Sequence, residues 1–165
     1  MSLHSKLGAT AAPDAARSYV ETLGLVERLH RLLLDVIKDE FERLGSAELN
    51  SVQALLLFNI GESEVSAGEL KSRGYYQGSN VSYNLKKLVE GGYMHHERSA
   101  IDRRSVRVRL TDKGLAVRRV VEELFARHTA TLDDRGVIGR DAGAETNAAL
   151  KRLERFWGDQ IRYIY

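Results

Sequence analysis

The fold is decided by one stretch of sequence, SNVSYNLKKLVEGGYMHHERSAIDRRSVRVRLTDKG (residues 79–114), in which the period of the apolar residues changes. Its first part carries apolar residues at spacings of three and four, which predicts a helix over about residues 79–90 with one buried side. Its last part, residues 105–110, alternates aliphatic and cationic side chains, as a half-buried strand does. Residues 93–98 are expected to pair with that strand. The stretch therefore predicts a helix followed by a two-stranded hairpin whose outer face is strongly cationic.

Two helices are predicted just upstream, and both begin with a capping signal. The first spans about residues 51–61, with Asn50 at its N-cap and Gln53 at the third helical position. The second is short and begins at Ser66, with Glu69 in the position that completes a capping box. Together with the helix and hairpin downstream, they predict a winged helix-turn-helix.

Long helices flank this lobe. The upstream one covers about residues 14–44, and its apolar stripe is wider than one small core needs, so part of it is expected to face a partner subunit. Downstream, one helix starts at Thr111 and runs to about residue 132. A polar stretch over residues 133–143 separates it from a last helix over about residues 144–161. The upstream stripe consists of Val26, Leu29, Leu33, Ile37, Phe41 and Leu44.

The predicted fold class is mainly α with a small β-hairpin wing. We expect a flexible tail over residues 1–13, an N-terminal dimerisation helix over residues 14–48, a winged helix-turn-helix lobe over residues 49–114 and C-terminal dimerisation helices over residues 115–165.

The distribution of charge favours binding to double-stranded DNA. The whole chain carries a net charge of +2, but residues 66–114 hold ten cations and five acids, which leaves the rest of the chain acidic. In a helix-turn-helix the second helix enters the major groove, where hydroxyl, amide and ammonium groups contact bases and phosphates. The side chains that we assign to this solvent face are Ser79, Asn80, Ser82, Tyr83, Asn84, Lys86 and Lys87.

Other classes of function find little support in the sequence. The chain has no cysteine, which excludes disulfides, thiolate metal sites and cysteine nucleophiles. His95 and His96 are adjacent on a strand and point to opposite faces, so they cannot share one metal ion. No nucleophile–base pair and no phosphate-binding glycine loop is present, so we expect no enzyme, no cofactor and no metal. No signal peptide and no run that could span a membrane is visible, which predicts a cytoplasmic protein without a membrane partner.

The wing carries a family resemblance. Residues 102–114, DRRSVRVRLTDKG, resemble the signature D-x-R-x-x-x-V-x-L-T-x-x-G of the MarR family of winged helix-turn-helix transcriptional regulators. Residues 85–93, LKKLVEGGY, resemble the end of that family's recognition helix. Residues 73–88 further resemble an alphaproteobacterial branch of the family that includes LdtR, a regulator tied to cell-wall L,D-transpeptidase expression.

The resemblance implies roles for the residues of the wing. Arg104 matches the arginine of the D-x-R motif and is the expected reader of a narrow minor groove. Asp102 is expected to orient that arginine, since a carboxylate beside phosphate is repelled. Arg103 and Arg107 are expected to contact the DNA backbone, and Thr111 to cap the helix after the wing.

The resemblance also implies a homodimer, built by the first and last helices, on a pseudo-palindromic operator. A repressor is expected, with activation at some promoters, and a small-molecule effector that binds where the dimerisation helices meet the lobe. Two alternatives remain. A nonspecific architectural protein would bind all duplexes alike with a steep salt dependence. A protein-interaction module would have to bury a dense row of arginines, which is costly without phosphate partners.

A first prediction follows from the role of Arg104. Arg104→Ala should weaken binding to the specific site much more than Lys113→Ala does, because only the former removes a minor-groove contact. Titration of each variant with operator DNA measures the difference. Equal losses would mean that Arg104 is one charge among many.

Overall fold

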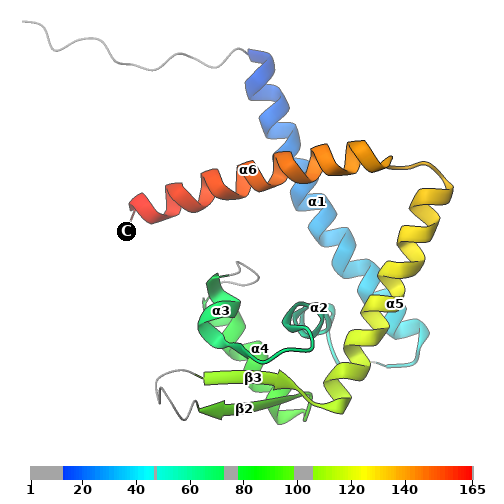
Figure 1. The fold of residues 1–165 in the computed structure, drawn as a ribbon, viewed down its shortest axis with the longest axis vertical. Coiled ribbons are helices and arrows are strands. Elements are labelled where there is room, and N and C mark those ends of the chain that lie inside the picture. The colour runs from blue at the N-terminus through cyan, green and yellow to red at the C-terminus, as the bar shows by residue number, and fades with distance from the viewer. Residues whose placement is uncertain (1–12, 47, 73–77, 99–105, 165) are drawn as a thin grey trace, which may run out of the picture. The chain divides into compact units, whose positions relative to one another are not determined.

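A computed structural model describes residues 13–46, 48–72, 78–98 and 106–164 (Figure 1). These residues fall into two compact units, Met1–Val121 and Glu122–Tyr165, and each is described by itself. The elements are α1 (Pro13–Arg43), α2 (Ser51–Ile60), β1 (Val65–Ser66), α3 (Ala67–Ser72), α4 (Gly78–Glu90), β2 (Met94–Arg98), β3 (Val106–Leu110), α5 (Asp112–Asp134) and α6 (Arg140–Ile164). The predicted class, mainly α with a small wing, is confirmed.

Both predicted capping boxes are present. The side chain of Asn50 accepts a hydrogen bond from the Gln53 amide at 2.8 Å, and the Gln53 side chain accepts one from the Asn50 amide at 3.2 Å. Ser66 Oγ accepts from the Glu69 amide at 3.0 Å, and the Glu69 carboxylate accepts from the Ser66 amide at 2.6 Å. These bonds satisfy amides that the first helical turn leaves free, so α2 and α3 begin where the sequence places them.

The wing contains one strand more than predicted. The sheet has the order β1-β3-β2, with both pairings antiparallel, so β3 is the central strand. In β1, Val65 lies opposite Val108 and Ser66 opposite Arg107. β1 was not predicted, because its two residues directly precede α3 and also provide the start signal of that helix. An N-cap residue has extended backbone, which leaves it free to pair with a strand.

The core of the first unit lies between the sheet and three helices. β3 turns Val108 and Leu110 inward, and both are buried. Leu57 from α2, Leu70 from α3 and Leu88 from α4 are fully buried in the same cluster. Because α2, α3 and α4 all pack on this face of the sheet, the other face of β2 and β3 is left to solvent (Figure 1).

In α1 the buried residues lie in the last part of the helix. Ile37, Glu40 and Phe41 are buried, and Arg43 donates two hydrogen bonds, of 3.0 and 2.8 Å, to the Glu40 carboxylate. Earlier along the helix, Leu29 is 62% exposed and many other apolar side chains are also exposed. Of the apolar stripe predicted along α1, Ile37 and Phe41 are therefore the buried members.

In the second unit the break between helices is shorter than predicted. Gly136, with a φ of 60°, ends α5, and Val137 N donates to Leu132 O at 3.0 Å. The prediction that α6 starts near residue 144 is wrong, because helix begins at Arg140. Several apolar side chains are exposed on α6: Leu150, Phe156, Trp157 and Ile161. In the described part of the chain, no helix is long and apolar enough to cross a membrane.

The start of α5 predicts a strict requirement for glycine. A Cβ on Gly114 would overlap the carbonyl oxygen of Tyr93 and lie 3.3 Å from Leu110 Cβ. Gly114→Ala should therefore lower the free energy of unfolding by about 3 kcal/mol. Gly158→Ala in α6 is the control, because nothing lies within 4 Å of its Cβ, and it should be neutral or stabilising by up to about 1 kcal/mol. Urea unfolding compares the two, and equal effects would contradict the prediction.

Candidate nucleic-acid interface

The solvent face of α4 carries most of the polar residues that the sequence assigned to it. Ser82, Tyr83, Lys86 and Lys87 are exposed, and Tyr83 is 61% exposed. The Lys87 ammonium lies 5.9 Å from the centre of the Tyr83 ring. Because Leu85 and Leu88 are buried, this face is fixed toward solvent.

Asn84 is a correction. Asn84 was predicted on the solvent face of α4, but the residue is 8% exposed and is buried. Asn84 lies four residues before Leu88, which is buried, so helical periodicity places both residues on the same face of α4. The polar amide of this side chain predicts a solvent-exposed position, whereas the helical spacing predicts a buried one.

The two lysines of α4 share one acidic neighbour. Lys86 Nζ lies 3.8 Å from Glu90 Oε1, and Lys87 Nζ lies 3.5 Å from Glu90 Oε2. All three side chains are about half exposed or more, and such surface pairs contribute little to stability. Both ammonium groups are therefore available to an incoming phosphate at little cost.

The remaining predicted contacts fall where side chains are not described. Ser79 and Asn80 belong to the first turn of α4, but their side chains lie outside the description. Asp102, Arg103 and Arg104 lie outside the described residues altogether.

The outer face of the wing is less cationic than the sequence suggests. Arg107 and Arg109 are exposed there, as the alternation predicts. However, Glu97 in β2 lies opposite Arg107, and Arg107 Nη1 lies 2.9 Å from Glu64 Oε1. The expectation of a strongly cationic face is thus wrong for the described part of the wing, since the two carboxylates offset the two arginines. The position of Glu64 beside Arg107 was not predicted, because it depends on the pairing of β1 with β3.

The junction between wing and α5 is closed by Thr111. Its hydroxyl donates to the Gly92 carbonyl oxygen at 2.7 Å and accepts from the Gly114 amide at 3.2 Å. The predicted capping role of Thr111 is confirmed. The same side chain ties the end of β3 to the turn that follows α4.

Three polar side chains connect the segment after α1 to this turn. Tyr93 Oη donates to Glu48 Oε2 at 2.8 Å. Lys113 Nζ lies 3.4 Å from the same oxygen, 4.1 Å from the centre of the Tyr93 ring, and donates to the Gly91 carbonyl oxygen at 3.1 Å. Lys113→Ala would therefore disturb the fold as well as the charge. Arg119, exposed on α5, is the better comparison for Arg104.

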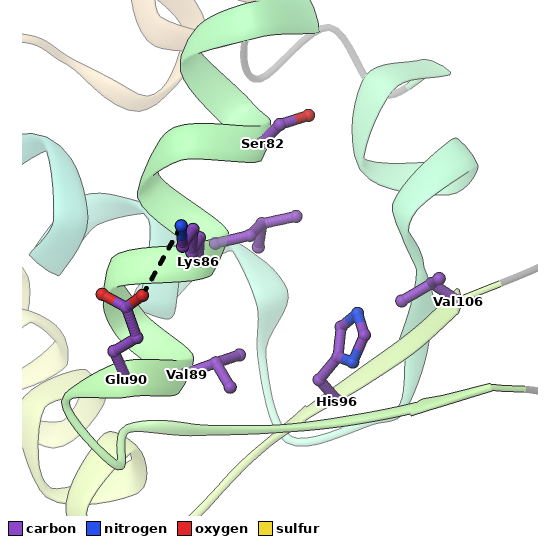
Figure 2. A pocket seen from close by; sticks show the side chains of 7 residues that line it. Ser82, Lys86, Val89, Glu90, His96 and Val106 are labelled. Carbon is purple, nitrogen blue, oxygen red and sulfur yellow. Dashed lines mark ion pairs between the residues drawn. The ribbon is translucent and has the colours of Figure 1, made fainter.

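A cavity of about 350 Å³ lies between α4 and the wing (Figure 2). Ser82, Leu85, Lys86, Val89 and Glu90 line it from α4, and His96 and Val106 line it from β2 and β3. Figure 2 shows His96 and Val106 across the hollow from the helix. The walls are mainly apolar, with the polar groups gathered on a few side chains.

His96 and His95 lie on opposite faces of β2, as predicted. His96 lines the cavity, whereas His95 lies opposite Arg109 on the outer face. The pair therefore cannot hold one metal ion between them.

Comparison with known proteins places this architecture. A family model described as a winged helix DNA-binding domain matches residues 49–114. The exopolysaccharide II synthesis transcriptional activator ExpG of Rhizobium meliloti is 35% identical over 152 residues, which cover 91% of this chain and 77% of ExpG. A MarR protein from Peptoclostridium difficile superposes over the full length of both chains with a TM-score of 0.71 at 16% identity. The chain belongs to the MarR family of winged-helix regulators. It is thus a DNA-binding transcriptional regulator.

A further structure of this MarR fold was determined with nucleic acid. FabT of Streptococcus pneumoniae, solved in complex with DNA, has a TM-score of 0.63 at 21% identity, over 86% of this chain and 99% of FabT. The narrower resemblance to the LdtR branch stays a prediction.

The contacts of Glu48 predict a pH dependence. The hydrogen bond from Tyr93 and the charge of Lys113 lower the pKa of Glu48 below its ordinary value of 4.5. A carboxyl whose pKa is lower in the folded state stabilises the fold fully above the unfolded value, and this contribution is lost as pH falls through the folded value. The Tm of the wild type should therefore fall more steeply than that of Glu48→Gln as pH drops below 4.5.

Calorimetry over the acid range measures these slopes. Glu123→Gln, which removes an exposed carboxylate of α5, serves as the control and should follow the wild type. Identical slopes for all three proteins would contradict the assigned contact.

Proposed function

We propose that the protein is a sequence-specific regulator that binds pseudo-palindromic operators as a homodimer in the cytoplasm, mainly as a repressor. The observation that carries the proposal is the exposed polar face of α4, with Ser82, Tyr83, Lys86 and Lys87 beside the wing. A face of this kind suits the major groove, where hydroxyls read base edges and ammonium groups neutralise phosphates. The complex of FabT with DNA supports DNA as the partner of this fold.

Roles along α4 follow from position. Ser79 and Asn80 are in its first turn, which in this docking mode comes nearest the base edges. Ser82 and Tyr83 follow one turn later. Lys86 and Lys87, in the second half, would contact phosphates. Asn84 is not carried forward, since its side chain is buried.

In the wing, Arg104 is proposed as the minor-groove reader, oriented by Asp102, and Arg103 as a backbone contact. Glu64 holds Arg107 in an ion pair, so we propose that Arg107 contacts the backbone mainly on non-operator DNA, where it must leave Glu64.

The exposed apolar residues of α1 and α6 support the homodimer. Leu29 and Leu32 on α1 are each more than half exposed, and so are Phe156 and Ile161 on α6. Apolar side chains that gather on a helix face generally mark an interaction surface. We propose that both helices become covered when two copies associate, and that residues 14–48 and 115–165 thus act as dimerisation segments around the lobe of residues 49–114.

The direction of regulation can differ between promoters. Repression needs only occupation of an operator that overlaps a promoter, which any tight binder achieves. The relative ExpG is named as an activator, which supports activation at some promoters as a second mode.

Modulation by a small molecule is part of the proposal. The cavity between α4 and the wing separates two elements that would contact the same DNA, and the residues that line it come from α4, β2 and β3. This cavity differs from the place implied by the family resemblance, which lies where the dimerisation helices meet the lobe. An effector that binds the DNA-incompetent conformation better would weaken operator affinity by that difference in affinity. Compounds that raise Tm and release operator DNA would identify it.

The decisive experiment is a titration at fixed, near-physiological salt. A duplex selected from a random library for tight binding is compared with a scrambled duplex of the same composition. We expect at least about 1,000-fold tighter binding to the selected duplex, at two chains per site. Selection that yields no preferred sequence would instead favour a nonspecific architectural protein.

The same titration tests the homodimer. Leu29→Glu places a charge in the exposed stripe of α1 and should convert dimer to monomer and weaken operator binding at least about tenfold. Arg31→Glu introduces the same residue on the opposite, charged side of α1 and should remain dimeric. Light scattering gives the oligomeric state, and a dimer that persists in Leu29→Glu would exclude this interface.

A further inference from the structure

Arg107 differs from the other described cations of the wing in its acidic surroundings. It lies on the central strand, with Glu97 opposite it on β2. On the other side, Glu64 directly precedes β1, and its Oε1 accepts a hydrogen bond from Arg107 Nη1 at 2.9 Å. The guanidinium is thus held at an exposed face, with a carboxylate already in the place that a phosphate would take.

The position of Glu64 is set by its neighbours. Val65 is paired with Val108 and is buried, and Ser66 is fixed by its capping bonds with Glu69. Glu64 itself is 40% exposed in its side chain and makes no part of the core. Substitution of Glu64 therefore removes the ion pair without removing packing.

We propose that Glu64 is a specificity-determining residue, which competes with DNA phosphates for Arg107 and so suppresses binding to non-operator DNA. This proposal rests on the proposed function. It assigns Glu64 no contact with DNA, because its effect is exerted through Arg107.

The physical basis is the different origin of the two kinds of binding. Contacts with phosphate supply essentially all of the affinity for non-operator DNA, whereas base contacts add to the affinity for the operator. On non-operator DNA the protein can shift along and across the backbone until a free arginine meets a phosphate. On the operator, base contacts fix the lobe against the DNA. Arg107 therefore cannot move to a phosphate beyond its reach, even when Glu64 no longer holds it. Loss of Glu64 should therefore strengthen binding to non-operator DNA more than binding to the operator.

The chain offers a matched control two residues away. Glu62 lies in the same loop between α2 and β1, and its Oε1 lies 3.2 Å from Arg118 Nη1. Arg118 is on α5, and its side chain is only 17% exposed. Glu62→Gln thus removes the same charge from the same loop without freeing an arginine of the wing.

The test uses the full chain and two duplexes, one selected for tight binding and one scrambled, over a range of salt. Glu64→Gln should bind the scrambled duplex about fivefold more tightly, with a salt slope steeper by about 0.9, the value of one added phosphate contact. Binding to the selected duplex should change less than about twofold, so discrimination falls. Glu62→Gln should leave both affinities within about twofold of the wild type.

A double variant shows whether the effect passes through Arg107. Glu64→Gln should give no gain on scrambled DNA when Arg107→Gln is already present. Three outcomes would overturn the role of Glu64: an equal gain from Glu62→Gln, a gain that persists without Arg107, or weaker binding of both duplexes by Glu64→Gln. Failure of the wild type to prefer the selected duplex would instead overturn the proposed function itself.

Discussion

The burial of one face of β3 is the constraint on which the rest of the lobe depends. Val108 is 1% exposed and is packed in the same cluster as Leu88 of α4 and Leu70 of α3. Because side chains alternate along a strand, this burial turns Arg107 and Arg109 outward without any further interaction. The same cluster fixes the rotation of α4, so the polar face of the helix and the outer face of the wing are positioned by a single core.

Signals that depend on a few neighbouring residues could be predicted from the sequence. The two capping boxes and the alternation in β3 specify the starts of α2 and α3 and the orientation of the wing, since each is a local rule. β1 could not be predicted, because two residues are too short to show a period. The contact of Glu64 could not be predicted either, because its partner Arg107 is 43 residues away in the sequence. Asn84 was predicted on the solvent face from its polarity, but its position in the helical repeat makes it buried.

Net charge alone therefore describes this surface poorly. A count of charges in the sequence treats every cation of the lobe as available to DNA. In the fold, Glu64 lies beside Arg107, and Glu90 lies beside both Lys86 and Lys87. Breaking an exposed ion pair costs little free energy. That cost is nevertheless subtracted from the free energy that the cation gains when it binds a phosphate. Membership of the MarR family establishes DNA binding, and the acidic neighbours set how readily each of these cations is released to a phosphate.

The contact between Glu48 and Tyr93 has a mechanical consequence. Glu48 lies in the short connection between α1 and α2, while Tyr93 and Lys113 flank the turns that end α4 and begin α5. One carboxylate thus joins the end of α1 to the turns that follow α4 and β3. A rotation of α1 transmitted through this connection must either carry the end of α4 with it or break the bond to Tyr93. The hydrogen bond to Tyr93 therefore couples the end of α4 to α1 in addition to the ion pair with Lys113 and the packing of α1 on α2.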